Sequence, residues 1–471
     1  MKERIAVIGS GYVGTVVAAC FAYLGHDVVG LEIDQDKLAA LSGGAAPFYE
    51  PGLDDLLAKG ISADRLRFTD SYPDAMESSE IVFICVGTPP RPDGSADMSH
   101  IEASAHSMAS NSRQHHVLVN KSTVPIGTAR WLASMLEREA GVDLFSVVSN
   151  PEFLREGKAV HDFLHPDRVI IGSDDDLGLD LLAEVYRPIL EQSLPGATGP
   201  RHSVPLVRTT PSTAEMAKYA SNAFLATKVS FINEIARLCE FVGADVTEVA
   251  EAMGLDPRIG GQFLQAGLGW GGSCFGKDVA ALTSTARNHS YNTRILEAAV
   301  AVNSDQREFV VDHLRKQLGQ LNGARVGVLG LAFKAGTNDL RDSPAVEVCR
   351  RLLDAGASVV AHDPLVDSVP QLPGLRVAPD IYEAVAGADA VVVATGWPQF
   401  LDLDFDRLKL AMHGSLFFDG RNTFDIAKVT SAGFHYVGVG RPSSQLYGHE
   451  VRPPEEIITW SSGAGSSPSE Q

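Results

Sequence analysis

The residue types and spacing that point most directly to chemistry lie between Trp270 and Asp278, in the run Trp-Gly-Gly-Ser-Cys-Phe-Gly-Lys-Asp. Cys274 stands among glycines that let a backbone approach a ligand closely, with Lys277 three residues further on. Because the thiolate is the nucleophilic form of cysteine, these surroundings are those expected of an activated thiolate. From this segment alone, a nucleophile and a small core residue are equally good interpretations of Cys274.

The remaining cysteines and the histidines give no metal-binding pattern. Five cysteines without a C-x-x-C pair fit a reducing cytoplasm rather than a disulfide framework, and no H-E-x-x-H occurs, so we predict no metal site. Residues 271–277 spell G-x-x-x-x-G-K, but Asp278 stands where a P-loop needs Ser or Thr, which disfavours nucleotide triphosphate hydrolysis. The cysteines in apolar runs are interpreted as buried core residues: Cys20, Cys85, Cys239 and Cys349.

Length and charge limit the class of protein. A chain of 471 residues exceeds what one core normally supports, so two or three domains are expected. With 39 basic and 59 acidic residues the formal net charge is −20, which argues against a nucleic-acid or anionic-membrane partner. Glycines interrupt the apolar run near the N-terminus, which is too short for a membrane span and a poor signal peptide. We therefore expect a cytoplasmic protein.

The N-terminus carries a dinucleotide-binding pattern. An apolar strand over 4–8 runs into the G-x-G-x-x-G turn of 9–14, followed by a helical run over 15–24 and a strand over 27–31 that ends at Glu32. The glycines permit pyrophosphate to approach a helix N-terminus, and the acid accepts hydrogen bonds from ribose while repelling a 2′-phosphate. NAD is therefore favoured over NADP as the cofactor, and a cofactor-binding turn is favoured over a glycine turn with only a structural role. The predicted cofactor contacts are Gly9, Gly11, Tyr12, Val13, Gly14 and Glu32.

Three further buried strands, over 81–87, 117–119 and 145–148, each end in a polar turn. In a parallel sheet, ligands bind beyond the carboxyl ends of the strands, so we expect these turns to face one crevice beside the cofactor. Taken singly, each side chain is more often an N-cap or turn residue. The residues are Thr88, Ser122, Thr123 and Glu152.

A long helix follows a Pro/Gly/Ser-rich junction at about 195–211. Ser212 opens a capping box, and no Pro or Gly occurs before Gly243, which predicts a helix of about 30 residues and roughly 45 Å. Lys218 and Asn222 are four residues apart and share one face, either as surface residues or as part of a site.

The C-terminal third repeats the α/β pattern. A helix is predicted over 304–318, and a second strand-turn-helix unit opens at 325–334 without the full G-x-G-x-x-G, which suggests another ligand. The prediction is an α/β fold with two Rossmann-like doubly wound parallel-sheet domains joined by a long central helix. The expected divisions are an NAD-binding domain (1–200), a central helical and dimerisation domain with the cysteine loop (205–305), a second Rossmann-like domain (315–450) and a disordered tail (453–471).

Seven motifs in order along nearly the whole chain resemble those of the UDP-glucose/GDP-mannose dehydrogenase family of nucleotide-diphosphate-sugar 6-dehydrogenases. Only the C-terminal tail lies outside them. The motifs are G-S-G-Y-V-G (9–14), V-G-T-P (86–89), K-S-T-V-P (121–125), N-P-E-F-L-R-E-G (150–157), E-M-A-K-Y-A-S-N (215–222), G-G-S-C-F-G-K-D (271–278) and F-D-G-R (418–421).

The resemblance implies an NAD-dependent, four-electron oxidation of the C6 alcohol of UDP-glucose to the carboxylate of UDP-glucuronate. It implies that Cys274 attacks the aldehyde intermediate to give a thiohemiacetal, which is then oxidised to a thioester. The thiohemiacetal is the tetrahedral adduct that the aldehyde needs to form before a second hydride can leave. GDP-mannose is the alternative substrate for the same mechanism. A two-electron hydroxyacid dehydrogenase would have no use for Cys274. A non-catalytic nucleotide-sugar or NAD sensor would have no use for Cys274, Lys218, Asn222 and Asp278 together.

The resemblance also assigns roles by position. It implies that Lys218 and Asn222 stabilise oxyanions, that Asp278 moves protons through a water near Thr123, and that Glu152 serves thioester hydrolysis. Arg258 resembles a residue contributed across a dimer interface, so a homodimer is expected. The implied further cofactor contacts are Lys37, Thr88, Ser122, Thr123, Glu156, Lys277 and Arg341. The implied substrate contacts, in a UDP-sugar-binding C-terminal domain and around it, are Glu152, Phe153, Leu154, Lys218, Asn222, Arg258, Phe263, Gly271, Phe333, Lys334 and Arg421.

Overall fold

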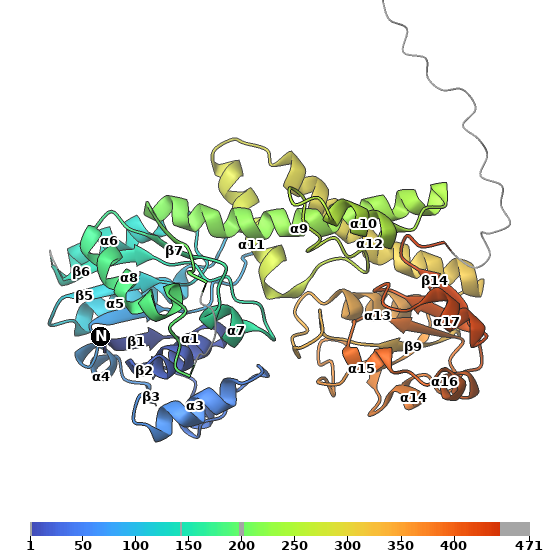
Figure 1. Ribbon diagram of the computed structural model, residues 1–471, viewed down its shortest axis with the longest axis horizontal. Coiled ribbons are helices and arrows are strands. Elements are labelled where there is room, and N and C mark those ends of the chain that lie inside the picture. The colour runs from blue at the N-terminus through green and yellow to red at the C-terminus, as the bar shows by residue number, and fades with distance from the viewer. Residues whose placement is uncertain (1, 142–143, 197–201, 443–471) are drawn as a thin grey trace, which may run out of the picture.

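The computed structural model describes residues 2–141, 144–196 and 202–442. Within them, two α/β domains lie side by side beneath a helical middle section, which confirms the predicted fold class (Figure 1). The predicted tail over 453–471 lies outside the described residues, and the predicted domain limits stay predictions. Among the described helices, none is both long and apolar enough to cross a membrane.

The N-terminal domain is built on an eight-stranded sheet in the order β3-β2-β1-β4-β5-β6-β7-β8. Neighbouring strands are parallel except β6 and β7, which pair antiparallel. Three of these strands were not predicted: β3 and β8 are short and half-exposed, so they lack a buried apolar run, whereas β7 is buried but has only four residues. The strands are β1 (Arg4–Ile8), β2 (Asp27–Leu31), β3 (Leu66–Thr69), β4 (Ile81–Ile84), β5 (His116–Asn120), β6 (Phe145–Ser149), β7 (Val169–Gly172) and β8 (Leu206–Thr209).

Helices cover both faces of this sheet, and a separate apolar core fills each face, as a doubly wound sheet requires. One core joins the sheet to α1, α3, α7 and α8, and the other joins it to α4, α5 and α6. The helices are α1 (Tyr12–Tyr23), α2 (Gln35–Ser42), α3 (Leu53–Ser62), α4 (Tyr72–Glu77), α5 (Ser99–Asn111), α6 (Thr128–Ala140), α7 (Ala159–Leu164) and α8 (Asp176–Leu190).

The middle section is organised along α9 (Pro211–Val242), which has 32 residues and runs above both sheets (Figure 1). The predicted cap at Ser212 is wrong, because the Thr210 hydroxyl accepts a hydrogen bond from the Thr213 amide and proline takes the first helical position. Proline suits that position since its missing N–H would have no partner there. Gly243 ends the helix in a left-handed conformation, as predicted.

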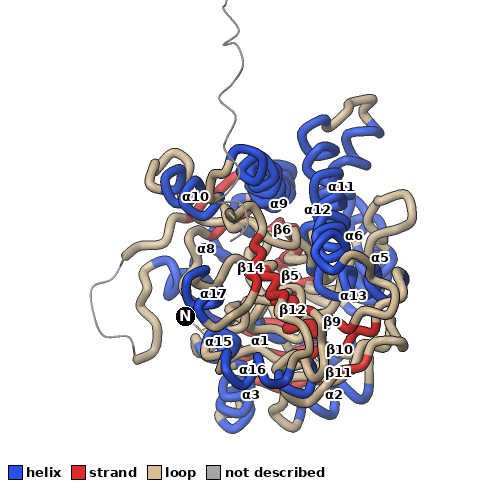
Figure 2. Tube along the Cα trace, turned by 90° about the vertical axis from the view of Figure 1, so that its right-hand side faces the viewer, coloured by secondary structure: helices blue, strands red, loops and turns tan. Residues whose placement is uncertain are grey.

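Three more helices belong to this section: α10 (Val246–Gly254), α11 (Gly272–Asn288) and α12 (Arg294–Leu318). α12 starts ten residues before the predicted helix over 304–318 and packs along α9, as the view from the side of the C-terminal sheet shows (Figure 2).

The C-terminal domain has a six-stranded, all-parallel sheet in the order β11-β10-β9-β12-β13-β14. Numbered within each sheet, this equals the order of the first six strands of the N-terminal sheet. The strands are β9 (Arg325–Leu329), β10 (Ser358–His362), β11 (Arg376–Val377), β12 (Ala390–Val393), β13 (Leu416–Asp419) and β14 (His435–Gly438). The helices are α13 (Pro344–Asp354), α14 (Ile381–Ala384), α15 (Pro398–Leu401), α16 (Phe405–Ala411) and α17 (Ile426–Ser431).

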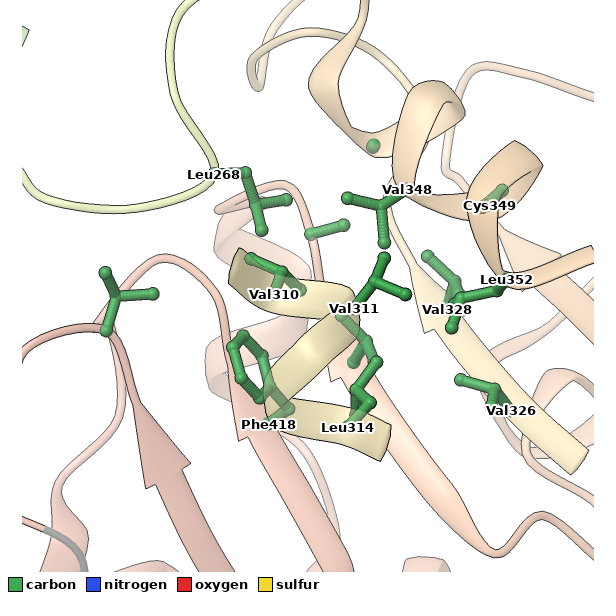
Figure 3. Close-up of a cluster of buried hydrophobic side chains, with 14 of the residues drawn as sticks. Leu268, Val310, Val311, Leu314, Val326, Val328, Val348, Cys349, Leu352 and Phe418 are labelled. Carbon is green, nitrogen blue, oxygen red and sulfur yellow. The ribbon is translucent and has the colours of Figure 1, made fainter. Parts of the chain in front are cut away.

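An apolar cluster fastens the middle section to the C-terminal sheet (Figure 3). Val311 and Leu314 of α12 are fully buried against Val328 of β9 and the side chains of α13. Leu268, from the loop that leads to the cysteine, joins the same cluster. Each such buried side chain contributes roughly 1.5–3 kcal/mol relative to an exposed one. The cysteine loop is therefore held on a rigid apolar base.

Candidate active site

A cavity of about 620 Å³ lies where the N-terminal domain, the middle section and the C-terminal domain meet. Its walls come from the loop after β6, from α9, from the first turn of α11 and from the loop after β9. These segments and others, among them the loop after α7 and the loop after α10, are far apart in the sequence and converge on one space. The predicted site residues that line it are Glu152, Phe153, Leu154, Glu156, Lys218, Asn222, Phe263, Gly271, Cys274, Phe333 and Lys334.

Cys274 lies in the first turn of α11, half-buried at the cavity wall. Gly271 caps this helix, and a side chain there would overlap the carbonyl oxygen of Asp342, so the close approach of the C-terminal domain requires glycine. Gly272 has a φ of +85°. The glycines therefore let the cysteine turn fit against the neighbouring domain.

The cation that acts on this thiol differs from the one expected. Lys277 donates to the Asp278 carboxylate at 2.6 Å, whereas the ammonium that favours the Cys274 thiolate is Lys218 of α9. Burial, together with the charge of Glu152, outweighs that ammonium and raises the pKa of Cys274 above its ordinary value. The resting group at neutral pH is therefore a thiol, and the activated thiolate inferred from the sequence is corrected.

Lys218 and Glu152 form a buried ion pair. Lys218 Nζ lies 2.8 Å from Glu152 Oε1, and the backbone N–H of Leu154 donates to Glu152 Oε2 at 2.6 Å. Burial opposes both charges, but the partner carboxylates and thiol raise the pKa of Lys218, and Lys218 helps to lower the pKa of Glu152. Both groups are therefore charged at neutral pH, which fixes an ammonium beside the Cys274 sulfur.

Asn222 and Asp278 form the next contact along the same two helices. Asn222 Nδ2 donates to Asp278 Oδ2 at 2.6 Å, and Asp278 is 1% exposed. Asn222 is one turn beyond Lys218 on α9, and Asp278 is one turn beyond Cys274 on α11. The predicted catalytic residues of α9 and α11 thus face each other in two successive layers.

Glu156 connects all three parts of the molecule. Its Oε1 accepts hydrogen bonds from Ser273 Oγ at 3.0 Å and from Arg341 at 3.4 Å, and its Oε2 accepts from Thr337 Oγ1 at 3.3 Å. Burial and the nearby charge of Asp339 raise the pKa of Glu156 to about 7. Ser273 and Thr337 escaped the sequence analysis because isolated hydroxyl residues carry no pattern of their own.

The turn after β1 fits a dinucleotide. Gly9 has a φ of +90°, and a side chain at Gly14 would overlap the Gly9 carbonyl oxygen. A Cβ at Gly11, the N-cap of α1, would meet open space, so pyrophosphate can approach the helix N-terminus there. Glu32 is 8% exposed at the end of β2, and its Oε1 accepts from the Asp34 amide at 2.9 Å. The other carboxylate oxygen is available for ribose.

The predicted hydroxyl contacts hold the neighbouring turns. Thr88 Oγ1 donates to the Thr123 carbonyl and Ser122 Oγ to the Val86 carbonyl, each at 2.7 Å. These bonds join the turns after β4 and β5. Lys37 is half-exposed, and its Nζ lies 3.8 Å from Asp34.

Two predicted substrate arginines lie outside the cavity lining. Arg258 is exposed and pairs with Asp256 at 2.5 Å. Arg421 donates through Nε to the Ala394 carbonyl at 2.6 Å and through Nη2 to the Phe333 carbonyl at 3.4 Å, and burial lowers its pKa to about 10. In this structure Arg421 supports the loop that carries Phe333 through a hydrogen bond to its backbone and does not line the cavity.

The far end of the cavity contains charges that the sequence analysis did not single out. Lys121 Nζ is buried, donating to Asn150 Oδ1 at 2.9 Å and to the Tyr186 hydroxyl at 3.1 Å, and burial lowers its pKa to about 8. The Arg168 guanidinium lies 3.8 Å over the Phe153 ring. A lysine two residues after the apolar run over 117–119 was the available signal for Lys121, because a charge so close to a buried strand needs a reason.

Comparison with known proteins assigns the family. Family models match residues 3–190 as an NAD binding domain, 212–305 as a central domain and 327–426 as a UDP binding domain, all of the UDP-glucose/GDP-mannose dehydrogenase family. The chain belongs to this family. It is therefore an NAD-dependent oxidoreductase with a nucleotide sugar as substrate, and the predicted resemblance is confirmed.

Individual relatives extend over nearly the whole chain. The chain is 47% identical to a UDP-glucose 6-dehydrogenase of Rhizobium meliloti over 449 residues, which cover 93% of this chain and 100% of the relative. It superposes on a UDP-glucose dehydrogenase of Pyrobaculum islandicum with a TM-score of 0.85 at 40% identity, covering 94% of this chain and 98% of that one. A GDP-mannose dehydrogenase of Pseudomonas aeruginosa matches with a TM-score of 0.51 at 32% identity, covering 93% and 99%.

Proposed function

We propose that this protein oxidises the C6 hydroxymethyl group of UDP-glucose to the carboxylate of UDP-glucuronate, with two NAD⁺ reduced in succession. The observation that carries the proposal is the position of Cys274 in a cavity shared by the three domains, beside a buried ammonium and a buried carboxylate. An oxidation that stopped at an aldehyde would have no use for a nucleophilic sulfur there.

The similarity to relatives favours UDP-glucose over GDP-mannose. The relative at 47% identity and the structure with a TM-score of 0.85 are both UDP-glucose enzymes, whereas the GDP-mannose dehydrogenase matches at 32% and 0.51. The third family model is a UDP binding domain. GDP-mannose remains the competing substrate within the same mechanism.

The first oxidation needs a proton acceptor and a site for negative charge at the C6 oxygen. The glycine turn of residues 9–14 and Glu32 would hold NAD⁺, which when bound would supply the hydride acceptor. In the proposed arrangement the Lys218 ammonium and the Asn222 amide stabilise the developing alkoxide, and Asp278 receives the proton through a water near Thr123. Lys218 is suited to this role because its neighbours raise its pKa and keep it charged.

The second oxidation uses the cysteine. The Cys274 sulfur bonds to the aldehyde carbon while its thiol proton passes to the aldehyde oxygen, giving a thiohemiacetal. Loss of the second hydride and of the hydroxyl proton leaves a thioester on Cys274. Water then attacks the thioester and the C–S bond breaks. The Cys274 thiol is regenerated, and the sugar carboxylate is formed. Glu152 is a negatively charged carboxylate in the cavity and is the proposed base or water-positioning group for this step.

The proposal is tested by counting NADH formed per nucleotide sugar consumed, with UDP-glucose and GDP-mannose offered separately. Two NADH with UDP-glucose and little reaction with GDP-mannose are expected. The Cys274→Ser variant should release at most one hydride equivalent, because its hydroxyl is a poor nucleophile toward the aldehyde. Cys239→Ser, at a buried cysteine outside the cavity lining, is the matched control and should keep the two-NADH stoichiometry.

The alternative outcomes separate the competing functions. One NADH per sugar in the unaltered protein would return Cys274 to a structural role. Two NADH with GDP-mannose alone would keep the mechanism and change the substrate. Continuous two-NADH turnover by Cys274→Ser would refute the nucleophile.

We also propose a homodimer formed through α9. Phe224, Phe231 and Leu238 recur every seven residues along this helix and are 65%, 46% and 53% exposed, so they share a face that a partner can cover. Arg258 lies exposed on the loop after α10, from which it can reach a second copy. Light scattering at micromolar concentration should give twice the chain mass, and Phe231→Glu should reduce it. The free cysteines fit the proposed cytoplasmic location.

A further inference from the structure

A buried carboxylate outside the reaction machinery connects the dinucleotide turn to the catalytic loop. Glu50 lies on the loop between α2 and α3 and is 6% exposed. It accepts hydrogen bonds from the hydroxyl of Tyr12 and from the backbone N–H groups of Gly157 at 2.7 Å and Ala159 at 2.8 Å. One carboxylate therefore joins the first residue of α1 to the end of the loop after β6.

Tyr12 is the residue directly after Gly11, where pyrophosphate approaches α1. Its ring packs against Phe48 at 4.7 Å, and its hydroxyl oxygen also accepts from the Gly157 amide at 3.0 Å. Burial and the hydrogen bond to Glu50 raise the pKa of Tyr12 far above its ordinary value, so the hydroxyl keeps the proton that it donates. The Tyr12 hydroxyl thus links the start of α1 directly to Glu50.

Gly157 is fixed from two sides. Toward the N-terminal domain its N–H is held by Glu50 and Tyr12. Toward the C-terminal domain it has a φ of +77°, and a side chain would overlap the carbonyl oxygen of Gly336. The residue before it is Glu156, which hydrogen-bonds to the C-terminal domain and to Ser273. Gly157 is therefore the position at which the dinucleotide turn, the catalytic loop and the C-terminal domain are in contact.

We propose that Glu50 is a positioning residue that couples occupancy of the dinucleotide turn to the geometry of residues 152–157 and, through them, to nucleotide-sugar binding. Binding of either ligand stabilises the same arrangement of Tyr12, Glu50 and Gly157, so each ligand tightens the binding of the other by the same factor. The two domains then meet in the arrangement that brings Glu156 to Ser273, beside the nucleophile.

Two variants cut this connection at different points. Gly157 and Ala159 donate to different oxygens of Glu50, so Glu50→Gln places an amide NH₂ group against one of these two backbone N–H donors and removes the negative charge from the contact that remains. Tyr12→Phe removes the link to α1 and leaves the direct Glu50–Gly157 bond. Asp54→Asn is the matched control, because Asp54 accepts from the Ala46 amide at 2.8 Å in the same region and takes no part in the connection.

The test is the dissociation constant of NADH, measured by its fluorescence, without and with saturating UDP-glucose, a pair that cannot react. UDP-glucose as the probe rests on the proposed function; the coupling does not. The unaltered protein and Asp54→Asn are expected to bind NADH at least about five-fold more tightly with UDP-glucose present. In Tyr12→Phe and Glu50→Gln the ratio should fall to about one, whatever the affinity of each variant for NADH alone, because the ratio compares the same variant without and with UDP-glucose.

The outcomes distinguish this inference from the proposed function. A ratio of one in the unaltered protein, or an unchanged ratio in Tyr12→Phe, would overturn the role of Glu50. If UDP-glucose fails to bind the unaltered protein, the proposed substrate is wrong, and the same titration with GDP-mannose decides the coupling. If Glu50→Gln fails to fold, Tyr12→Phe gives the answer alone.

Discussion

The two sheets share a strand order and differ in the loops that leave their first strands. At the end of β1 the Gly9 amide donates to the Leu31 carbonyl at 3.0 Å, and at the end of β9 the Gly330 amide donates to the His362 carbonyl at 2.7 Å. Both glycines have positive φ, +90° and +97°. The residue after the second strand is an acid in each domain, Glu32 in the first and Asp363 in the second.

The two acids do opposite things. Glu32 stays at the rim of its turn and leaves the backbone donors of α1 open, whereas Asp363 Oδ2 accepts from the amides of Leu331 at 2.7 Å and Ala332 at 3.1 Å. Asp363 therefore occupies the place that a phosphate would take. The next helix begins only at Pro344, and the intervening loop carries Phe333 and Lys334 into the cavity.

Two domains with the same strand order can therefore bind different ligands. In the C-terminal domain, the Asp363 carboxylate fills the glycine turn, and the long loop between β9 and α13 forms part of the wall of the cavity that holds Cys274.

The largest effect is expected when the second turn is broken. Asp363→Ala leaves the amides of Leu331 and Ala332 and the Trp397 Nε1–H, now 3.0 Å from Asp363, buried without an acceptor. Each unsatisfied buried group costs about 1–3 kcal/mol, so three of them should lower the free energy of unfolding of the C-terminal domain by at least about 3 kcal/mol. Urea unfolding measures it. Glu32→Ala is the counterpart and should weaken NADH binding with little loss of stability; equal stability of both variants would contradict the comparison.

A smaller effect is expected when the first turn is broken. The Cβ of Gly14→Ala would overlap the Gly9 carbonyl oxygen, and overpacking of this kind costs about 1–3 kcal/mol, so NADH affinity should fall on the order of 10- to 100-fold. Gly396→Ala is the control from the second domain, since its added methyl meets other atoms only at 3.6 Å or more. Titration of NADH fluorescence compares them, and equal affinities would show that the close contact at Gly14 is unimportant.

The smallest effect concerns the contact between the two regions. Burial and Asp339 raise the pKa of Glu156 from 4.5 to about 7, so the folded protein favours the protonated acid. The stabilisation is complete below pH 4.5 and is lost as pH rises through 7. Glu156→Gln should therefore match the unaltered protein at about pH 5 and exceed its free energy of unfolding by about 2 kcal/mol at about pH 8. Melting temperatures at both pH values test this, and a pH-independent difference would exclude titration of Glu156.

Features encoded by neighbouring residues were predictable from the sequence. The strands over 4–8 and 27–31 have the predicted limits, and α9 ends at Gly243, because a buried apolar run and a left-handed glycine act locally. The cap at Thr210 was missed because a competing capping box lay two residues further on.

The site itself was predictable only where a motif carried it. Lys277 was the nearest cation to Cys274 in sequence, yet Lys218, on another helix, acts on the thiol in space. Asp363 gave no signal because a lone Asp after a strand looks like a turn residue, and the three donors to its Oδ2 come from distant segments. Such contacts depend on how helices and loops pack over long separations in sequence.

Because Asp363 fills the second glycine turn, the order in which the two NAD⁺ molecules bind is restricted. Within the described residues the chain offers one open glycine turn of the dinucleotide type, so the two cofactors of the proposed reaction have to use it one after the other. The half-oxidised sugar must outlast the exchange of NADH for NAD⁺. The half-oxidised sugar must therefore dissociate more slowly than NADH. A covalent bond between the sugar and Cys274 is one way to ensure this order.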